Sequence, residues 1–175
     1  ETFRDDILFP MAAGIGICLC LNHLLMLLPF AQEGWQETAE TIYLPPLWLQ
    51  ILCTGFVIPA VEELIFRGYA FRSLRQEMSF LPAACVSSIY FGLFHGSLYQ
   101  GFYAFLVGLL LAVVCERRRS LYSAWIVHAA ANLTAIVFTA REINGFLRES
   151  VAWLAVTAAA GGAVVIYSVY RMRGK

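Results

Sequence analysis

The sequence predicts an all-α fold: a polytopic transmembrane bundle of about six helices, with a polar cluster near the bilayer midplane. Composition supports this class. Of the 175 residues, 60% are hydrophobic and 14% are charged, and the mean hydropathy is +0.70. Soluble domains contain about 45–50% apolar and about 25% charged residues, and they avoid large exposed apolar patches. The apolar residues also gather into stretches about as long as a membrane helix.

Six apolar stretches, separated by short polar joints, are each expected to form one membrane helix. They are Ile7–Phe30, Leu47–Phe71, Phe80–Tyr99, Phe102–Cys115, Leu121–Ala140 and Val151–Tyr170. The fourth stretch is short, and the joint before it is expected to turn tightly at Gly101, because glycine tolerates turn conformations. The chain is interpreted as one membrane-embedded domain over residues 1–175, whose motif-bearing core covers 47–140.

The basic residues predict the orientation, because cytoplasmic loops carry an excess of Lys and Arg. If six helices alternate in direction, most of the basic residues fall on one side of the membrane. These are Arg4, Arg72, Arg75, Arg117, Arg118, Arg119, Arg171, Arg173 and Lys175. The other side carries the acidic 31–46 loop, which is expected to lie at the membrane interface, and only Arg141 and Arg148 as basic residues. Both termini are therefore expected in the cytoplasm.

Charge and cysteine content argue against two classes of protein: nucleic-acid binders and extracellular domains held by disulfides. The chain has 12 Lys and Arg against 12 Asp and Glu, so it lacks the basic excess that a nucleic-acid partner requires. The five cysteines lie in apolar runs without metal-binding or disulfide spacing and are interpreted as buried thiols. No cleavable signal peptide is expected, because the first apolar stretch is too long for one.

A few polar residues lie inside the predicted spans, where ionisable groups are costly and mark functional sites. They are Glu62, Glu63 and Arg67 in the second span, His95 at the end of the third, and His128 and Asn132 in the fifth. Glu63 and Arg67 are i, i+4 neighbours that can form an ion pair, which leaves Glu62 to face elsewhere. The helical rise places Glu62, His95, His128 and Asn132 at similar depths. Asn22 and His23 in the first span are interpreted as structural.

These residues form three motifs: Glu-Glu-x-x-x-Arg at 62–67, Phe-x-x-x-His at 91–95 and His-x-x-x-Asn at 128–132. Together they resemble the signatures of the CPBP intramembrane proteases, also called the CAAX type II or ABI family, in a short prokaryotic-type form. The resemblance implies a glutamic-type protease in a bacterial or archaeal membrane, with a membrane-associated peptide or protein as substrate and no cofactor.

The resemblance also implies a role for each residue. Glu62 would be the general base that activates water, and His95 would hold that water. His128 and Asn132 would form the oxyanion side of the site. Glu63 and Arg67 would be supporting residues that fix the second helix.

Alternatives stay open at this point. Glu62, His95 and His128 are a three-ligand set that could bind zinc with an open position, although the zinc-hydrolase pattern HExxH is absent. A non-catalytic scaffold or immunity protein could keep the polar cluster for folding. A transporter with Glu62 as proton relay is disfavoured because the spans show no internal repeat. The substrate could be a lipidated C-terminal tail, a bacteriocin or pheromone leader, or a C-terminal membrane anchor, and the oligomeric state is open.

Overall fold

The computed structural model describes residues 4–27, 44–141 and 150–172, and within these ranges the chain forms helices and no strand. Five helices of this part are long and apolar enough to cross a membrane, and a sixth is apolar but shorter. The long ones are α1 (Asp5–Met26), the helix Leu47–Glu77, α7 (Leu98–Arg118), α8 (Leu121–Ala140) and α10 (Val151–Arg171). The predicted all-α polytopic bundle is confirmed. Most of the 31–46 loop, up to residue 43, lies outside the described residues.

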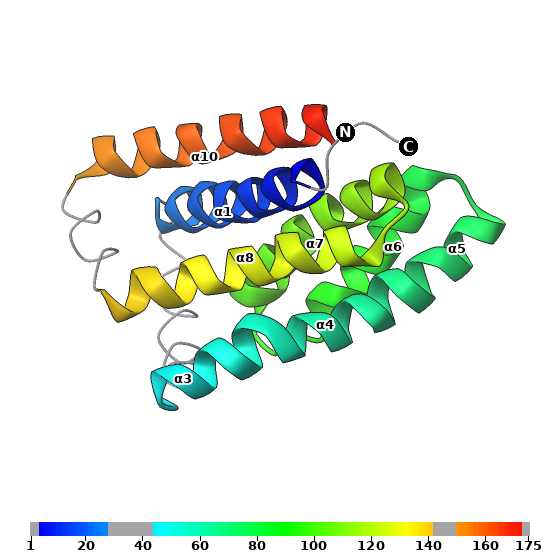
Figure 1. The fold of residues 1–175 in the computed structure, drawn as a ribbon, viewed down its shortest axis with the longest axis horizontal. Coiled ribbons are helices and arrows are strands. Elements are labelled where there is room, and N and C mark those ends of the chain that lie inside the picture. The colour runs from blue at the N-terminus through cyan, green and yellow to red at the C-terminus, as the bar shows by residue number, and fades with distance from the viewer. Residues whose placement is uncertain (1–3, 28–43, 142–149, 173–175) are drawn as a thin grey trace.

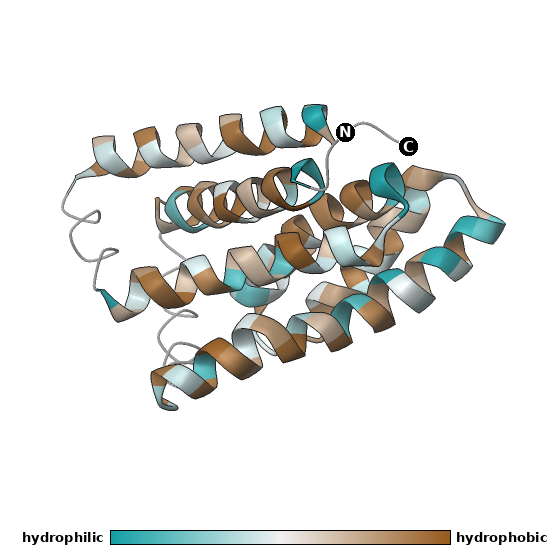
Figure 2. Ribbon diagram, viewed as in Figure 1, coloured by the Kyte–Doolittle hydropathy of each residue, from teal (hydrophilic) through white to brown (hydrophobic). Residues whose placement is uncertain are grey.

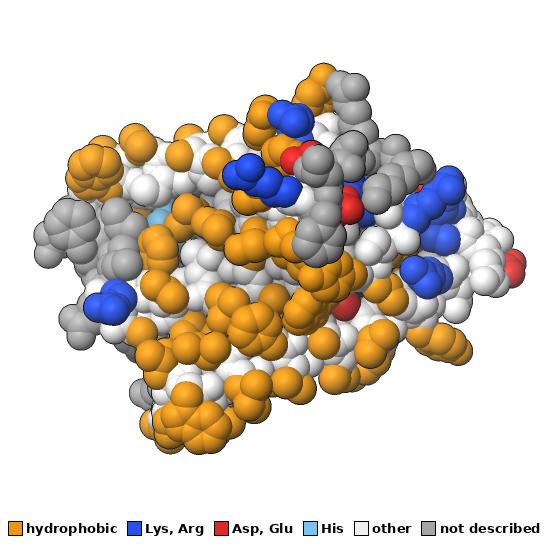
Figure 3. Space-filling model, viewed as in Figure 1, with side chains coloured by type: hydrophobic (Ala, Val, Ile, Leu, Met, Phe, Trp, Pro, Cys, Tyr) orange, Lys and Arg blue, Asp and Glu red, His pale blue; other side chains and the backbone are white. Residues whose placement is uncertain are grey.

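The helices run back and forth along one direction, so that both ends of the chain lie at the same end of the bundle (Figure 1). Hydrophilic residues gather at that end, whereas the rest of the bundle is mostly hydrophobic (Figure 2). On the face drawn in Figure 3, hydrophobic side chains cover much of the surface, and most Lys and Arg side chains lie toward the same end. The described basic residues Arg4, Arg72, Arg75, Arg117, Arg118, Arg119 and Arg171 belong to helix termini that meet there. We refer to it as the arginine-rich end.

The second helix is long and changes its winding along its length. It consists of α3 (Leu47–Leu49), the π-helical stretch η1 (Gln50–Val57), α4 (Ile58–Glu63), a second π-helical stretch η2 (Leu64–Phe71) and α5 (Arg72–Glu77). At about 1.5 Å per residue its 31 residues span up to about 46 Å, more than the roughly 30 Å of a bilayer core. The helix therefore continues past the predicted end at residue 71 into the polar region at the arginine-rich end.

The break between the third and fourth helices differs from the prediction. The third helix, α6 (Phe80–Leu93), has 14 residues, and α7 has 21, so the third helix is the short one. The reversal occurs at Gly96, whose φ of 75° is a left-handed conformation that suits glycine. Ser97 then caps α7 by accepting a hydrogen bond from the backbone N–H of Gln100 at 3.2 Å.

Gly101, the predicted turn residue, lies inside α7 and has a packing role. A Cβ atom at this position would lie 3.0 Å from the carbonyl oxygen of Gly92 in α6. The absence of a side chain on either residue lets the backbones of α6 and α7 approach closely, as small residues do between membrane helices. Composition alone cannot separate a glycine that turns a chain from one that lets two helices touch.

On the other side of the bundle, α1 lies between α10 and α8 (Figure 1). A Cβ atom on Gly161 of α10 would lie 2.6 Å from the carbonyl oxygen of Gly16 in α1, so these backbones are in contact. The core is formed by small and aliphatic side chains that include Ala13, Leu111 and Val127. These packed helices fix the positions of α7 and α8, which carry part of the polar site.

Candidate active site

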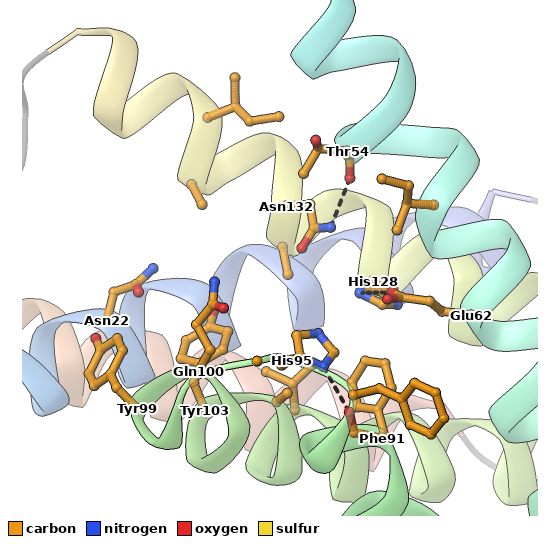
Figure 4. Close-up of a pocket in the computed structure, with 18 residues that line it drawn as sticks. Asn22, Thr54, Glu62, Phe91, His95, Tyr99, Gln100, Tyr103, His128 and Asn132 are labelled. Carbon is orange, nitrogen blue, oxygen red and sulfur yellow. Dashed lines mark hydrogen bonds and ion pairs between the residues drawn. The ribbon is translucent and has the colours of Figure 1, made fainter. Parts of the chain in front are cut away.

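A cavity of about 490 Å³ lies among α1, η1, α4, the α6–α7 turn, α7 and α8. Its polar lining residues are Asn22, Thr54, Glu62, His95, Tyr99, Gln100, Tyr103, His128 and Asn132. Figure 4 shows side chains from these helices converging on one space. The structure thus brings the predicted Glu62, His95, His128 and Asn132 together around one cavity. Glu63 and Arg67 do not line this cavity.

The adjacent carboxylates Glu62 and Glu63 have different environments. Glu63 is buried, with 1% of its surface exposed, and its Oε1 accepts from Nη1 of Arg67 at 3.1 Å and from Nδ1 of His128 at 3.0 Å. The Glu62 side chain is 24% exposed, and its Oε2 lies 3.6 Å from Nε2 of His128. Glu63 is therefore engaged in holding helices together, whereas Glu62 presents its carboxylate to the cavity.

Arg67 is fully buried, which requires partners because an unpaired charge is costly away from water. Besides the ion pair with Glu63, its Nη2 donates to the carbonyl oxygen of Gly108 in α7 at 3.0 Å. A Cβ atom at residue 108 would lie 2.9 Å from Nη2, so the glycine makes room for the guanidinium. The guanidinium also lies over the ring of Phe91, 4.4 Å from its centroid. Arg67 therefore joins η2 to α6 and α7.

His128 lies between the two carboxylates. Because a carboxylate oxygen accepts, the contact with Glu63 assigns a proton to Nδ1 of His128. The opposite ring atom, Nε2, faces Glu62 (Figure 4). Glu63 thus orients the imidazole of His128 and directs its Nε2 toward Glu62.

His95 lies in the turn after α6 and is held by its own motif. Its Nδ1 is 2.7 Å from the carbonyl oxygen of Phe91, one helical turn earlier, so Nδ1 carries the proton and Nε2 of the neutral ring is an acceptor. The Phe91 ring packs edge-on against His95 at 4.6 Å and against His128 at 5.6 Å between centroids. Phe91 is thus the buried spacer between the two histidines, which explains why the motif pairs an aromatic residue with His95.

Asn132 is fixed by an irregularity in the helix opposite. Its Nδ2 donates to the carbonyl oxygen of Thr54 at 2.8 Å. In the π-helical register of η1, that carbonyl would accept from residue 59, but Pro59 has no N–H to donate. The carbonyl is therefore left for a side chain, and Asn132 supplies it. One N–H of the amide is used in this way, and the second remains for a ligand.

Besides Thr54, four polar residues of the cavity lining have no counterpart in the motif prediction: Asn22, Tyr99, Gln100 and Tyr103. Asn22, interpreted from sequence as structural, lies on the cavity wall with its Nδ2 donating to Sγ of Cys18 at 3.1 Å. Together these residues make the end of the cavity away from Glu62 polar (Figure 4). A signal is present in the sequence, since residues 99 and 103 are i, i+4 neighbours that share a helix face.

His23, also interpreted as structural, is fully buried beside the Phe138 ring, 6.1 Å between centroids. It does not belong to the cavity lining described here. In the described part of the chain, no three His, Cys, Asp or Glu side chains are grouped so that they could hold a metal ion. The three-ligand set of Glu62, His95 and His128 is thus not assembled as a metal site in this structure.

Comparison with known proteins gives two matches. Over 117 residues, 67% of its length, the chain is 25% identical to the Bacillus subtilis protein named "Putative membrane peptidase YdiL". The alignment covers 47% of that protein, so the chain spans about half the length of this curated relative. No solved structure matches the chain.

The second match is to a family model described as type II CAAX prenyl endopeptidase Rce1-like, and it covers residues 44–134, just over half of the chain. This region runs from the start of the second helix to Thr134 in α8, and it contains all three motifs together with the α6–α7 turn. The chain therefore belongs to the Rce1-like family of type II CAAX prenyl endopeptidases.

Proposed function

We propose that the protein is an intramembrane endopeptidase that hydrolyses a peptide bond of a membrane-associated substrate with a water molecule activated by Glu62. The observation that carries this proposal is the convergence of Glu62, His95, His128 and Asn132, from three separate motifs, on one cavity. Family membership supports peptidase chemistry. Each hydrogen-bonding side chain costs free energy to place inside a membrane bundle. Helix packing alone therefore does not account for four of them around one cavity.

Glu62 is the general base in this proposal, because its carboxylate faces the cavity while the neighbouring Glu63 is occupied by Arg67 and His128. A water molecule near Glu62 would lose a proton to the carboxylate as its oxygen bonds to the substrate carbonyl carbon. The resulting tetrahedral intermediate breaks its C–N bond, and the same proton passes from Glu62 to the leaving nitrogen. The products are a carboxyl group and an amine.

The other three residues position the water and stabilise charge. Nε2 of neutral His95 can accept a hydrogen bond from the water, because Nδ1 is held by the Phe91 carbonyl. The free N–H of the Asn132 amide is the candidate donor to the developing oxyanion. Because the Nδ1 proton of His128 is directed at Glu63, Nε2 of His128 can donate to the oxyanion only when the ring carries a second proton. Donors fixed in advance by the protein are effective for such charge, and one of them contributes about 3–4 kcal/mol in measured cases.

The lining of the cavity also suits a peptide substrate. Its lining combines the reactive end with apolar side chains such as Ile58 and Phe94 and with the polar residues at the far end. An extended peptide backbone needs both apolar contact and hydrogen-bond partners for its amides. A membrane-associated segment that has locally unwound fits this combination of surfaces.

The test is to map new protein termini in membranes of cells that produce the wild type, Glu62→Gln or Glu77→Gln. Glu77 is an exposed carboxylate at the end of the same long helix and serves as the matched control. Termini that appear with the wild type and with Glu77→Gln should fall about a thousandfold in rate with Glu62→Gln, while that variant still purifies folded. Equal cleavage by Glu62→Gln, or no new termini with the wild type, would contradict the proposal.

A metal test on purified enzyme then addresses the zinc alternative. Chelator-dialysed protein should retain cleavage of a substrate found in this way. Stoichiometric zinc whose removal abolishes activity and whose return restores it would replace the glutamic mechanism with a metal-assisted one.

A further inference from the structure

A second cavity, of about 370 Å³, lies at the arginine-rich end, between α5 and the C-terminal end of α7. It is lined by Phe71, Arg72 and Arg75 from one helix and by Cys115, Glu116 and Arg119 from the other. Three of these six side chains are arginines and one is a carboxylate. The catalytic proposal uses none of them, and the motifs do not include them.

Arg75 and Glu116 form the fixed wall of this cavity. Nη2 of Arg75 lies 2.8 Å and its Nε 3.3 Å from carboxylate oxygens of Glu116, and Nη1 donates to the Met78 carbonyl at 2.8 Å. All three guanidinium nitrogens are thus engaged, and the Glu116 charge is neutralised by a two-point contact. The pair connects α5 to α7 and leaves the other two arginines to determine the charge of the cavity.

Arg72 and Arg119 are exposed, and neither forms an ion pair or hydrogen bond within the described part of the chain. The two residues before Arg119 are engaged: Arg118 pairs with Asp6, and Arg117 donates to the Val169 carbonyl at 2.9 Å. The cavity therefore carries two uncompensated positive charges. They outweigh the partial negative charge, about half a unit, at the end of α7.

The backbone conformation of Arg119 is a separate observation. Its φ of 49° and ψ of 33° place it in the left-handed region, where glycine is favoured and other residues are strained. A glycine would end α7 there without strain. The arginine side chain instead lies beside the cavity, opposite Arg72, across two segments that are 47 positions apart in sequence.

We propose that this cavity binds the phosphate of an anionic phospholipid headgroup through Arg72 and Arg119. Guanidinium groups suit phosphate because they donate paired hydrogen bonds to its oxygens. The long helix leaves the bilayer core near Arg72, and the preceding turns expose Leu64, Ile65 and Tyr69, which offers an apolar surface for acyl chains below the headgroup. Basic pockets at helix ends are known sites for anionic lipids. The proposal does not depend on the peptidase activity.

The test measures lipid binding by the full chain in neutral detergent, using native mass spectrometry and thermal unfolding. Phosphatidylglycerol should add one retained lipid and raise the melting temperature, whereas phosphatidylcholine should do neither. Arg72→Gln and Arg119→Gln should each weaken phosphatidylglycerol binding about tenfold, and the double variant should lose the retained lipid. Without added lipid, the variants should melt with the wild type, since neither guanidinium has a partner to lose.

Arg4→Gln is the matched control, because it removes one exposed positive charge from the same end without touching the cavity. It should bind phosphatidylglycerol as the wild type does. Equal loss in Arg4→Gln, or full binding by the double variant, would show attraction to diffuse charge and overturn the proposal. The last measurement uses inorganic phosphate in place of the lipid. If phosphate raised the melting temperature as much as phosphatidylglycerol does, the cavity would be a site for soluble phosphate and the lipid assignment would be overturned.

Discussion

The two sides of the bundle hold their helices together by different means. Where α1 meets α10, Gly16 and Gly161 bring two backbones into contact. Where the second helix meets α7 and α8, the contacts are polar: Glu63 holds Arg67 of its own helix and His128 of α8, and Arg67 donates to the Gly108 carbonyl of α7. The first contact depends on shape, and the second depends on every charged partner being present. The comparison shows why a partly exposed carboxylate such as Glu62 suits the second side, where polar partners already exist.

Removing one partner of the buried Glu63–Arg67 ion pair should have the largest effect on stability. Glu63→Gln leaves Arg67 buried without a carboxylate, so the free energy of unfolding should fall by about 3–5 kcal/mol. Chemical or thermal unfolding in micelles measures this change, and the exposed Glu77→Gln should change it by less than about 0.5 kcal/mol. Adding Arg67→Met to Glu63→Gln should recover part of the loss, because the uncompensated charge is gone. If Glu63→Gln left the free energy of unfolding unchanged, the ion pair would not have this stabilising role.

The glycine contact should be weaker and more local. Gly161→Ala places a Cβ atom against the α1 backbone and should cost about 1–3 kcal/mol. Gly162→Ala is the matched control, since its Cβ atom would lie 3.5 Å from Sγ of Cys20, an ordinary contact. That variant should be neutral or gain up to about 1 kcal/mol from helix propensity. Cleavage per folded molecule should be unchanged in both, because no described residue of α10 lines the cavity proposed as the active site.

A double-mutant cycle tests the link between Asn132 and the π-helical stretch. Asn132→Ala should destabilise the protein by about 1–3 kcal/mol, because the Thr54 carbonyl loses its donor. Pro59→Ala restores an N–H that this carbonyl can use, so the cost of Asn132→Ala should then be about 1 kcal/mol smaller. The loss of cleavage should be equal in both backgrounds if Asn132 contacts the substrate. If the two substitutions change the free energy of unfolding additively, Pro59 does not determine the position of Asn132.

The smallest effect concerns the end of the proposed active-site cavity that lies away from Glu62. The Gln100 side-chain amide has no hydrogen-bond partner within the described residues and lines the cavity. If it binds a substrate amide, Gln100→Leu should raise KM about fivefold and leave kcat unchanged, in line with one neutral hydrogen bond. Gln76→Leu changes an exposed glutamine in α5 and should alter neither constant. A fall in kcat alone would place Gln100 with the reacting groups instead.

Spacing along a helix predicted part of the site. The i, i+4 relation gave the Glu63–Arg67 ion pair, which is present at 3.1 Å, and helical rise placed Glu62, His128 and Asn132 at depths where they could meet. These inferences worked because they rely on local geometry, which a helix determines by itself.

Other features depend on contacts between distant segments. The sequence interpretation treated Asn22 as structural, yet it lines the cavity because α1 is packed beside α8. The turn at Gly96 rather than Gly101 depends on how closely α6 approaches α7. The π-helical winding of η1 leaves the Thr54 carbonyl without a backbone donor. In the local sequence, the only sign of this winding is a proline.

The shortness of α6 has a consequence for water supply. Its 14 residues rise about 21 Å, so roughly 9 Å of the bilayer core remains beyond its end. In the turn Phe94–Ser97, the backbone N–H groups of Phe94, His95 and Ser97 are hydrogen-bonded, whereas that of Gly96 has no partner among the described residues. Such a group persists in a membrane only beside protein or a hydrated space. Hydrolysis, the reaction proposed for this cavity, needs the same hydration. Because α6 stops partway, the turn brings His95 to the cavity, and we expect a hydrated route at this end of α6, which fast hydrogen exchange of the Gly96 amide should reveal.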